Sequence, residues 1–345
     1  MHVSANSGKV SGTPERLTLG STEDVSPTLS GEGRLAFASQ IASTDLWMLP
    51  VDADRGKAIG PMRRLTQDSA TAYYPHLSAS GTKLVWQSNH EGNQDIWVRD
   101  FATGRSFGLT NTPDLETAPR ISSDGSKVVY EVAENGKHVL YSISSGGGVA
   151  QRICDDCGRP TDWSRNGSLI LFDSVRPLPF SVWSLDPQSG RKACLLRDRG
   201  SVYSARLSRD DRWMVFHVQT SSAGRQVYVA PFHGPVEVPR SEWIAITDGN
   251  QADREPYFSP DGGLIYFLSD RDGFRCIWAQ RVDAASHRPV DQPFAVQHFH
   301  SARRSLANVS WATGLIGLSV SQDAIVFAQG DITGNIWMTA LAQRR

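Results

Sequence analysis

The chain has 345 residues, with 35 Lys plus Arg against 36 Asp plus Glu and a formal net charge of −1. This balance excludes a global basic field for nucleic acid and an acidic excess for a basic partner, so we expect no nucleic-acid binding by this domain. No stretch approaches the roughly 18–20 apolar residues that a membrane helix needs, so we expect no membrane insertion. Residues 1–15 are polar and lack an apolar core, which predicts a disordered tail or linker remnant rather than a signal peptide.

From residue 16 onward, a unit of strand, tight turn, strand, turn and strand recurs seven times. The first strand of each unit closes on a serine: Ser30, Ser78, Ser122, Ser164, Ser208, Ser259 and Ser321. An aromatic residue follows in the third strand, 16 to 20 residues later: Trp47, Trp97, Tyr141, Trp183, Tyr228, Trp278 and Trp337. The near-constant spacing within units predicts rigid hairpins joined by adjustable loops.

A glycine follows three residues after the serine in five copies, where a turn position with positive φ favours it. These glycines are Gly33, Gly81, Gly125, Gly167 and Gly262. Asp211 and Ala324 replace the glycine in the fifth and seventh copies, so we expect turns of another type, or slightly strained turns, at these two places.

Most third strands are followed by a short fourth apolar run that often ends in threonine, as at Thr66, Thr110 and Thr247. The last copy lacks this run, yet Arg16–Thr18 has its form and precedes the first copy. We therefore predict an all-β fold, a seven-bladed β-propeller of four-stranded antiparallel blades. It forms a single domain over residues 16–345, closed by the N-terminal strand pairing with the last blade.

The repeat is most complete between Glu255 and Ala279, where P-x-apolar-S-x-D-G is followed by S-x-R-D-G and an apolar-aromatic pair. This pattern resembles the TolB-type propeller repeat over about residues 16–342. The resemblance implies a non-catalytic binding or sensing module that recognises a protein or a small ligand at the mouth of the channel. We expect the protein to be a monomer.

The candidate binding residues lie in the connections that lead from the outer strand of one blade to the inner strand of the next. In a propeller these connections meet at one end of the central channel. They combine charged and aromatic side chains, as recognition surfaces do. The predicted channel-mouth residues are Asp24, Tyr73, Tyr74, Glu116, Arg159, Asp162, Tyr203, Asp253, Arg254 and Glu255.

The cysteines allow several interpretations. Cys154 and Cys157 form a C-x-x-C between the third and fourth copies, which suits half a zinc site, a redox pair, or a structural loop with a local disulfide in an oxidising compartment. We favour the structural loop, because the sequence lacks a second ligand pair and predicts no helix there. Cys194 and Cys276 fall within strand patterns and are expected to be small buried hydrophobes.

The histidines suggest an alternative function. His298 and His300 alternate along a strand-like segment and can point the same way. Together with His76 and His217 they would suit a metal-assisted saccharide lyase or hydrolase if they converged on the channel. Our prediction nevertheless contains no metal, no cofactor and no catalytic residue, since the sequence has neither a G-x-S-x-G elbow nor a phosphate-binding loop.

A third possibility is the orphan propeller half of a peptidase or transcriptional regulator. Repeats of this type often follow another module in the family that the chain resembles, so we expect a fragment of a longer chain. The protein would be periplasmic if that chain is exported or membrane-anchored, and cytoplasmic otherwise.

Overall fold

The computed structural model describes residues 2–3, 10–11, 23–31, 34–66, 70–221, 224–309 and 317–340. The chain divides into two compact units. We call residues 1–42 with 332–345 the terminal unit, and residues 43–331 the propeller unit. The single-domain prediction for residues 16–345 stays a prediction, and its boundary at residue 15 lies outside the described residues.

The propeller unit contains five four-stranded antiparallel sheets, each built from consecutive strands. We number these five blades in chain order, from the first to the fifth. Their strands are β7 (Ala72–Leu77), β8 (Lys83–Ser88), β9 (Asp95–Asp100) and β10 (Ser106–Gly108); β11 (Glu116–Ile121), β12 (Lys127–Glu134), β13 (Lys137–Ser144) and β14 (Gln151–Cys154); β15 (Arg159–Trp163), β16 (Ile170–Asp173), β17 (Val182–Leu185) and β18 (Lys192–Leu196); β19 (Val202–Leu207), β20 (Trp213–Gln219), β21 (Arg225–Pro231) and β22 (Ile244–Ala245); β23 (Arg254–Phe258), β24 (Leu264–Ser269), β25 (Cys276–Val282) and β26 (Pro289–Gln297).

A further sheet of the propeller unit combines strands from both ends of the chain, and we call it the composite sheet. Two of its strands are unusually long, and only their parts within residues 43–331 belong to this unit. Its strands are β28 (Leu318–Val320), β29 (Ala324–Ala340), β4 (Arg34–Asp52), β5 (Lys57–Ala58), β6 (Arg63–Arg64) and β27 (Arg304–Ser305). β28 pairs with β29, β29 lies beside β4, and β6 pairs with β4 at Trp47 and Met48.

The prediction of seven blades is wrong, because the structure has five. A blade needs a chain reversal between its second and third strands. The first copy has none, since β4 runs for 19 residues, and the last copy has none, since β29 runs for 17. The third and fourth strands of the first copy therefore share the composite sheet with the first two strands of the last copy. The predicted closing segment, residues 16–18, lies outside the described residues.

The terminal unit contains the remaining strands. β1 (His2–Val3) pairs with β2 (Val10–Ser11), and β3 (Glu23–Leu29) pairs with the first part of β4. The last part of β29 carries Trp337, which is 56% exposed. The aromatic residue of the last copy thus belongs to the terminal unit and not to the third strand of a blade.

The repeated serine shapes the turn after each inner strand. In the second blade, Ser122 Oγ accepts the backbone N–H of Lys127 at 3.0 Å and donates to Asp124 at 2.6 Å. Gly125 follows with φ of 73°, a conformation that glycine adopts without steric cost. In the fourth blade Asp211 adopts the same region with φ of 55°, whereas Ser321 N–H bonds to Ala324 in a tighter turn. These two turns were expected to be of another type or slightly strained; the turn at Asp211 places a non-glycine residue at positive φ, and the turn at Ala324 is of another type.

The threonine that ends the fourth strand ties it to the third. Thr110 Oγ1 accepts the N–H of Ile96 at 2.9 Å in the first blade. Thr66 Oγ1 accepts the N–H of Leu46 at 3.0 Å in the composite sheet. The composite sheet thus reproduces the outer edge of an ordinary blade.

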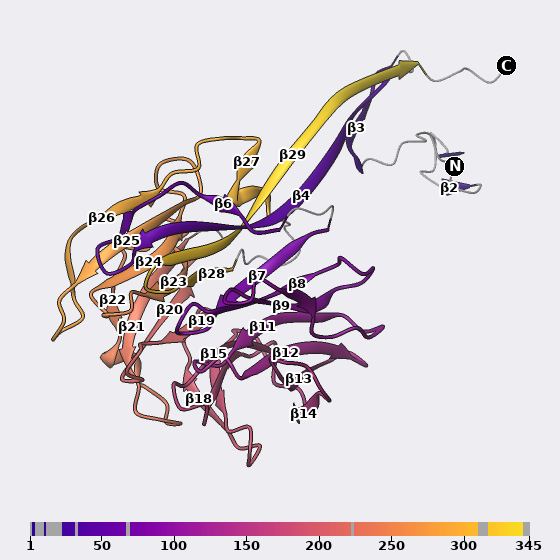
Figure 1. The fold of residues 1–345 in the computed structure, drawn as a ribbon. Helices are drawn as coiled ribbons and strands as arrows, with labels where there is room; N and C mark the ends of the chain where they lie inside the picture. Colours follow the sequence, from indigo (N-terminus) through magenta and orange to yellow (C-terminus); the bar gives the residue numbers. More distant parts are fainter. Residues whose placement is uncertain are drawn as a thin grey trace. The chain divides into compact units, whose positions relative to one another are not determined.

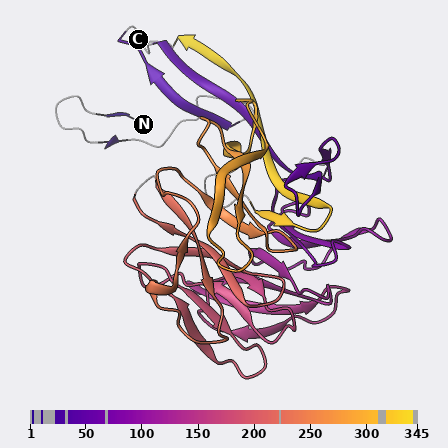
Figure 2. The same ribbon diagram turned by 90° about the vertical axis from the view of Figure 1, so that its left-hand side faces the viewer.

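The apolar core lies between neighbouring sheets. Val85 and Ile96 of the first blade, for example, cluster with Ile121 and Val128 of the second. The first strands of the five blades, β7, β11, β15, β19 and β23, contact one another in order, and β28 contacts both β7 and β23. These strands close a ring, and the sheets follow one another around it in chain order (Figures 1 and 2). Two short 3-10 helices, η1 (Arg240–Glu242) and η2 (Leu306–Asn308), occur in loops.

Candidate functional site

The inner strands place one polar side chain each at an equivalent position, two residues before the repeated serine. We call these six residues the hub layer: His76, Arg120, Asp162, Arg206, Tyr257 and Ser319. The backbone just before this position is irregular, since the register shifts within all five inner strands of the blades. Bulges of this kind re-aim side chains, and they recur next to functional sites.

The hub layer links the inner strands through hydrogen bonds from the residue that follows it in a neighbouring strand. Such bonds fix the polar side chains in a place where ordinary core residues would be apolar. They join Leu77 N–H to Ser319 Oγ (2.9 Å), Ile121 N–H to His76 Nδ1 (3.2 Å), and Leu207 N–H to Asp162 Oδ2 (2.8 Å).

Two arginines face one carboxylate in this layer. Arg120 and Arg206 are 3% and 6% exposed. Burial, together with the charge of Arg206, lowers the pKa of Arg120 to about 9. Burial raises the pKa of Asp162 even though Arg206 and Arg120 oppose that rise. Two guanidinium groups against one carboxylate leave the hub layer with a positive balance.

His76 adds a neutral donor. Burial, followed by the charges of Arg206 and Arg120, lowers its pKa well below the usual value. Because Nδ1 accepts the Ile121 N–H, the neutral ring carries its proton on Nε2. That nitrogen lies 3.9 Å from Asp162 Oδ1, which is too far for a hydrogen bond. Among the described residues, His76 Nε2 and Arg206 Nη1 are both buried without a hydrogen-bond partner.

A cavity of about 400 Å³ adjoins the hub layer at the end where the inner strands turn into their hairpins. His76, Asp162 and Tyr257 line its inner part. Turn residues line the rest, among them Ser80, Ser123, Asp124, Arg165, Arg209 and Asp211. The cavity thus lies at the opposite end of the inner strands from the predicted channel mouth.

Three predicted channel-mouth residues interact with one another around the starts of the inner strands. The Arg159 guanidinium lies 5.7 Å from the centre of the Tyr74 ring. Burial would lower the pKa of Arg159, but Tyr74 and several carboxylates, including Glu255, raise it overall. Glu255 is itself engaged, because it accepts the N–H of Gly317 at 2.7 Å.

The other predicted residues lie inside the blades or outside the propeller unit. Glu116 is 2% exposed and accepts hydrogen bonds from Thr110 and Thr112. The structure places the other five predicted residues as follows: Tyr73 is in the core, Tyr203 stacks on His217, Asp253 pairs with Arg271, Arg254 lies 3.9 Å from Asp270, and Asp24 is on β3 of the terminal unit. Of the ten predicted residues, Asp162 alone belongs to the hub layer and lines the cavity.

Sequence reasoning missed Arg120, Arg206, Tyr257 and Ser319. The sequence does contain a signal for them, since each stands two residues before one of the repeated serines. The pattern alone does not predict these residues as a site, because strand interiors are usually apolar core and recognition residues usually lie in loops.

The cysteine and histidine side chains are not arranged as the alternative function, a metal-assisted saccharide lyase or hydrolase, would require. Cys154 and Cys157 form a disulfide, as the structural interpretation allowed. His298 and His300 do share a cluster with metal-binding potential, but neither His76 nor His217 belongs to it. The four histidines therefore do not converge on the channel. Cys276 is buried as expected, whereas Cys194 is half-buried.

The comparisons with known proteins agree with this architecture. The family model described as TolB beta propeller domain matches residues 52–230, about half of the chain. An uncharacterized protein of Agrobacterium fabrum is 30% identical over 159 residues, covering 45% of this chain and 51% of that protein. A TolB homolog of Chlorobaculum tepidum is 30% identical over 100 residues, covering 28% of this chain and 23% of that protein. The chain thus spans about half or less of these curated relatives.

Solved structures show the same fold at low sequence identity. A structure assigned as TolB from Agrobacterium tumefaciens has a TM-score of 0.63 at 18% identity, covering 85% of this chain and 99% of that one. TolB from Acinetobacter baumannii has a TM-score of 0.57 at 14% identity, covering 84% and 65%. Across the described residues, no helix has the length and apolar character needed to span a bilayer. With the family model matching residues 52–230, the chain belongs to the TolB beta propeller domain family.

Proposed function

We propose that this TolB-like propeller is a non-catalytic binding module that recognises a carboxylate group of a protein or small ligand at its central channel. The TolB-like fold supports a binding or scaffold module. The observation that favours a carboxylate is the pair of unpartnered buried donors, Arg206 Nη1 and His76 Nε2. Buried donors without partners cost about 1–3 kcal/mol each, so a ligand that satisfies them gains that much in binding.

The charge of the site supports the same ligand. Arg120 and Arg206 repel each other, as the lowered pKa of Arg120 indicates. The single opposing carboxylate, Asp162, already accepts the N–H groups of Trp163 and Leu207. Of the hub layer, His76, Asp162 and Tyr257 line the cavity, so a carboxylate would have to pass these side chains to reach the arginines. There it would receive charge-assisted hydrogen bonds and relieve the repulsion.

The predicted channel mouth offers a second part of the same recognition surface. Tyr74, Arg159 and Glu255 interact at the other end of the inner strands. A protein partner that covers this mouth would use them as aromatic and charged anchors.

The test is ligand-induced stabilisation of wild type and of Arg206→Gln. The probes are succinate, citrate, and a short peptide with either a free C-terminal carboxylate or a C-terminal amide. A bound ligand at 100 times its Kd stabilises the fold by about 2.7 kcal/mol. We expect at least one carboxylate probe to raise the Tm of wild type, and Arg206→Gln to abolish that rise.

Arg206→Gln removes a buried charge that Arg120 repels, but it also removes the favourable interactions of Arg206 with Asp162 and the Tyr257 ring. The Tm rise of the variant is therefore measured from the Tm of its own ligand-free form. Arg212→Gln is the matched control, since Arg212 is exposed and paired with Asp210 outside the hub layer. An equal Tm rise in Arg206→Gln and wild type would refute the proposal, as would the absence of a rise with every probe. Stabilisation by the free peptide but not its amide or the small acids would identify a protein terminus as the ligand.

A further inference from the structure

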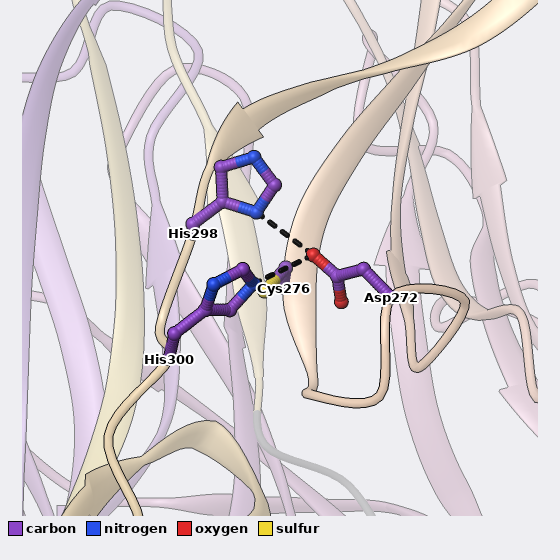
Figure 3. Close-up of side chains that lie close together, drawn as sticks. All are labelled: Asp272, Cys276, His298 and His300. Atoms are coloured by element: carbon purple, nitrogen blue, oxygen red, sulfur yellow. Dashed lines mark hydrogen bonds and ion pairs between the residues drawn. The ribbon is translucent and has the colours of Figure 1, made fainter.

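Four side chains from separate parts of the fifth blade gather at one end of its sheet. Asp272 lies in the turn between β24 and β25, Cys276 begins β25, and His298 and His300 follow β26. One possible ligand atom from each lies within 4.8 Å of those of all the others. Figure 3 shows the two imidazole rings and the carboxylate directed toward one another, with the sulfur beside them.

The imidazole nitrogens are already aimed at one point. His298 Nδ1 and His300 Nε2 each lie 2.8 Å from the same oxygen, Oδ2 of Asp272. Two imidazole nitrogens thus converge on one carboxylate oxygen, and each would exchange this hydrogen bond for a bond from its lone pair to a metal ion held among them.

The cysteine completes this set from the buried side. Its side chain is inaccessible to solvent, and its Sγ accepts the backbone N–H of Phe299 at 3.3 Å. Phe299 stands between the two histidines, so one short segment supplies two nitrogen ligands and a hydrogen bond to the sulfur. Hydrogen bonds to ligand atoms from such surroundings are a regular feature of metal sites, because they orient the ligands.

The chemistry of the donors selects the ion. Two imidazoles, one thiolate and one carboxylate suit zinc or a similar transition metal, whereas magnesium and calcium prefer oxygen ligands alone. Zinc binds four such ligands tetrahedrally at about 2.0–2.3 Å, which places them roughly 3.5 Å apart. The observed limit of 4.8 Å needs only small side-chain adjustments to reach that spacing.

The surroundings allow the ion to enter and to be held. The side chains of His298 and His300 are 50% and 47% exposed, whereas Asp272 is 20% exposed. Trp278 packs edge-on against His298 at 5.9 Å, and Phe274 lies 4.9 Å from His300. The half-exposed rings give access from solvent, while the aromatic contacts fix their orientation.

We propose that Asp272, Cys276, His298 and His300 form a zinc site that fastens the segment after β26 to the β24–β25 hairpin. Four protein ligands leave no open position, so the site is structural rather than catalytic. The bound ion would hold in place the segment that leads from the fifth blade to the composite sheet.

The test is zinc titration of chelator-treated protein without reductant, in competition with a chromophoric chelator. We expect one zinc ion per chain, a rise in Tm on zinc addition, and no competition from millimolar magnesium. His300→Gln, a half-exposed position at which the fold should tolerate the change, should weaken zinc binding by at least about 100-fold, since loss of a ligand exceeds the 10–100-fold effect of an outer partner. His233→Gln is the control, because that exposed histidine lies outside the cluster.

Cobalt replacement tests the sulfur ligand separately. The cobalt-loaded protein should show the near-ultraviolet charge-transfer band of a thiolate ligand, and Cys276→Ser should lose it. The absence of saturable binding at one equivalent would overturn the proposal. Unchanged zinc affinity in the His298→Gln/His300→Gln double variant would overturn it as well, because the ion would then bind elsewhere.

Discussion

The five blades and the composite sheet are built from the same repeat but differ at one turn. In the blades, a tight reversal separates the second strand from the third, as at residues 270–273 of the fifth blade. In the composite sheet, β4 and β29 run straight through the equivalent place. The inner serine turn and the outer threonine bond are nevertheless present in both. A copy of the repeat therefore forms a blade of its own only when the chain reverses between its second and third strands.

The largest expected loss of unfolding free energy comes from truncating one core phenylalanine in each region. Phe327 of β29 and Phe216 of β20 are both fully buried. If the composite sheet is a full part of the ring, Phe327→Ala and Phe216→Ala should each cost about 3–5 kcal/mol. Urea unfolding measures both. A cost below about 1 kcal/mol for Phe327→Ala alone would mean that the composite sheet is only loosely attached.

The next test uses the outer threonines. Thr110→Val in the first blade and Thr66→Val in the composite sheet each leave a backbone N–H without its acceptor, at Ile96 and Leu46 respectively. Each should cost about 1–3 kcal/mol of unfolding free energy. Thermal unfolding of the two variants in parallel is the measurement. A cost confined to Thr110→Val would contradict the equivalence of the two edges.

The inner turns test whether left-handed strain matters, through one substitution that introduces it and one that removes it. Gly81 has φ of 70°, and an added Cβ would lie 3.2 Å from Ser321 Oγ of the composite sheet. Gly81→Ala should therefore cost about 1–2 kcal/mol. Asp211→Gly should relieve the left-handed strain at φ of 55°, so its net effect should stay within about 1 kcal/mol. Equal destabilisation by the two changes, measured in urea, would remove strain as the explanation.

The smallest expected effect is a pH dependence located at one blade junction. Burial, the dominant cause, and the neighbouring Asp95 raise the pKa of Glu116 to about 7, although Thr110 and Thr112 oppose this. The folded state thus holds a proton more tightly than the unfolded state. Stability from this group is complete below about pH 4.5 and is lost as the pH rises to about 7. The full shift corresponds to at most about 3 kcal/mol, which solvent screening and the interaction with Asp95 reduce to on the order of 1 kcal/mol.

Glu116→Gln should flatten that loss. At the junction of the composite sheet with the first blade the equivalent residue is Ala72, so that junction should add no such dependence. Chemical denaturation between pH 4.5 and 7.5 measures the slope. An unchanged slope in Glu116→Gln would assign the pH dependence to other groups, such as Asp173, whose pKa burial raises to about 6.

The sequence predicts the all-β repeat, its serine turns and its family well, because these depend on residues a few positions apart. The number of blades could not be obtained by counting serines, since Ser30 and Ser321 mark copies without the second reversal. The two long strands share one sheet because segments far apart in the chain pair, as the hydrogen bond from Val51 N–H to the Asp323 carbonyl shows. That pairing depends on tertiary packing rather than on the local pattern.

The candidate site was predictable only in part. The sequence predicts Asp162 as a residue of the loop at the channel mouth, whereas the structure places it within the inner strand β15, where it lines the cavity. Arg120 and Arg206 were absent from the prediction, because a buried, incompletely paired arginine is uncommon and no local pattern announces it. The convergence of His298 and His300 followed from their alternation, but their meeting with Asp272 and Cys276 required the hairpin geometry.

The central claim is that the composite sheet closes the ring on which the hub layer stands. Amide hydrogen exchange tests it most directly, by comparing Val326 and Leu49 of the composite sheet with Val215 and Val229 of the fourth blade. We expect similar protection at all four amides, since all four residues are buried in the propeller unit. Exchange at Val326 and Leu49 that is faster by orders of magnitude would show that the ring is open at this sheet.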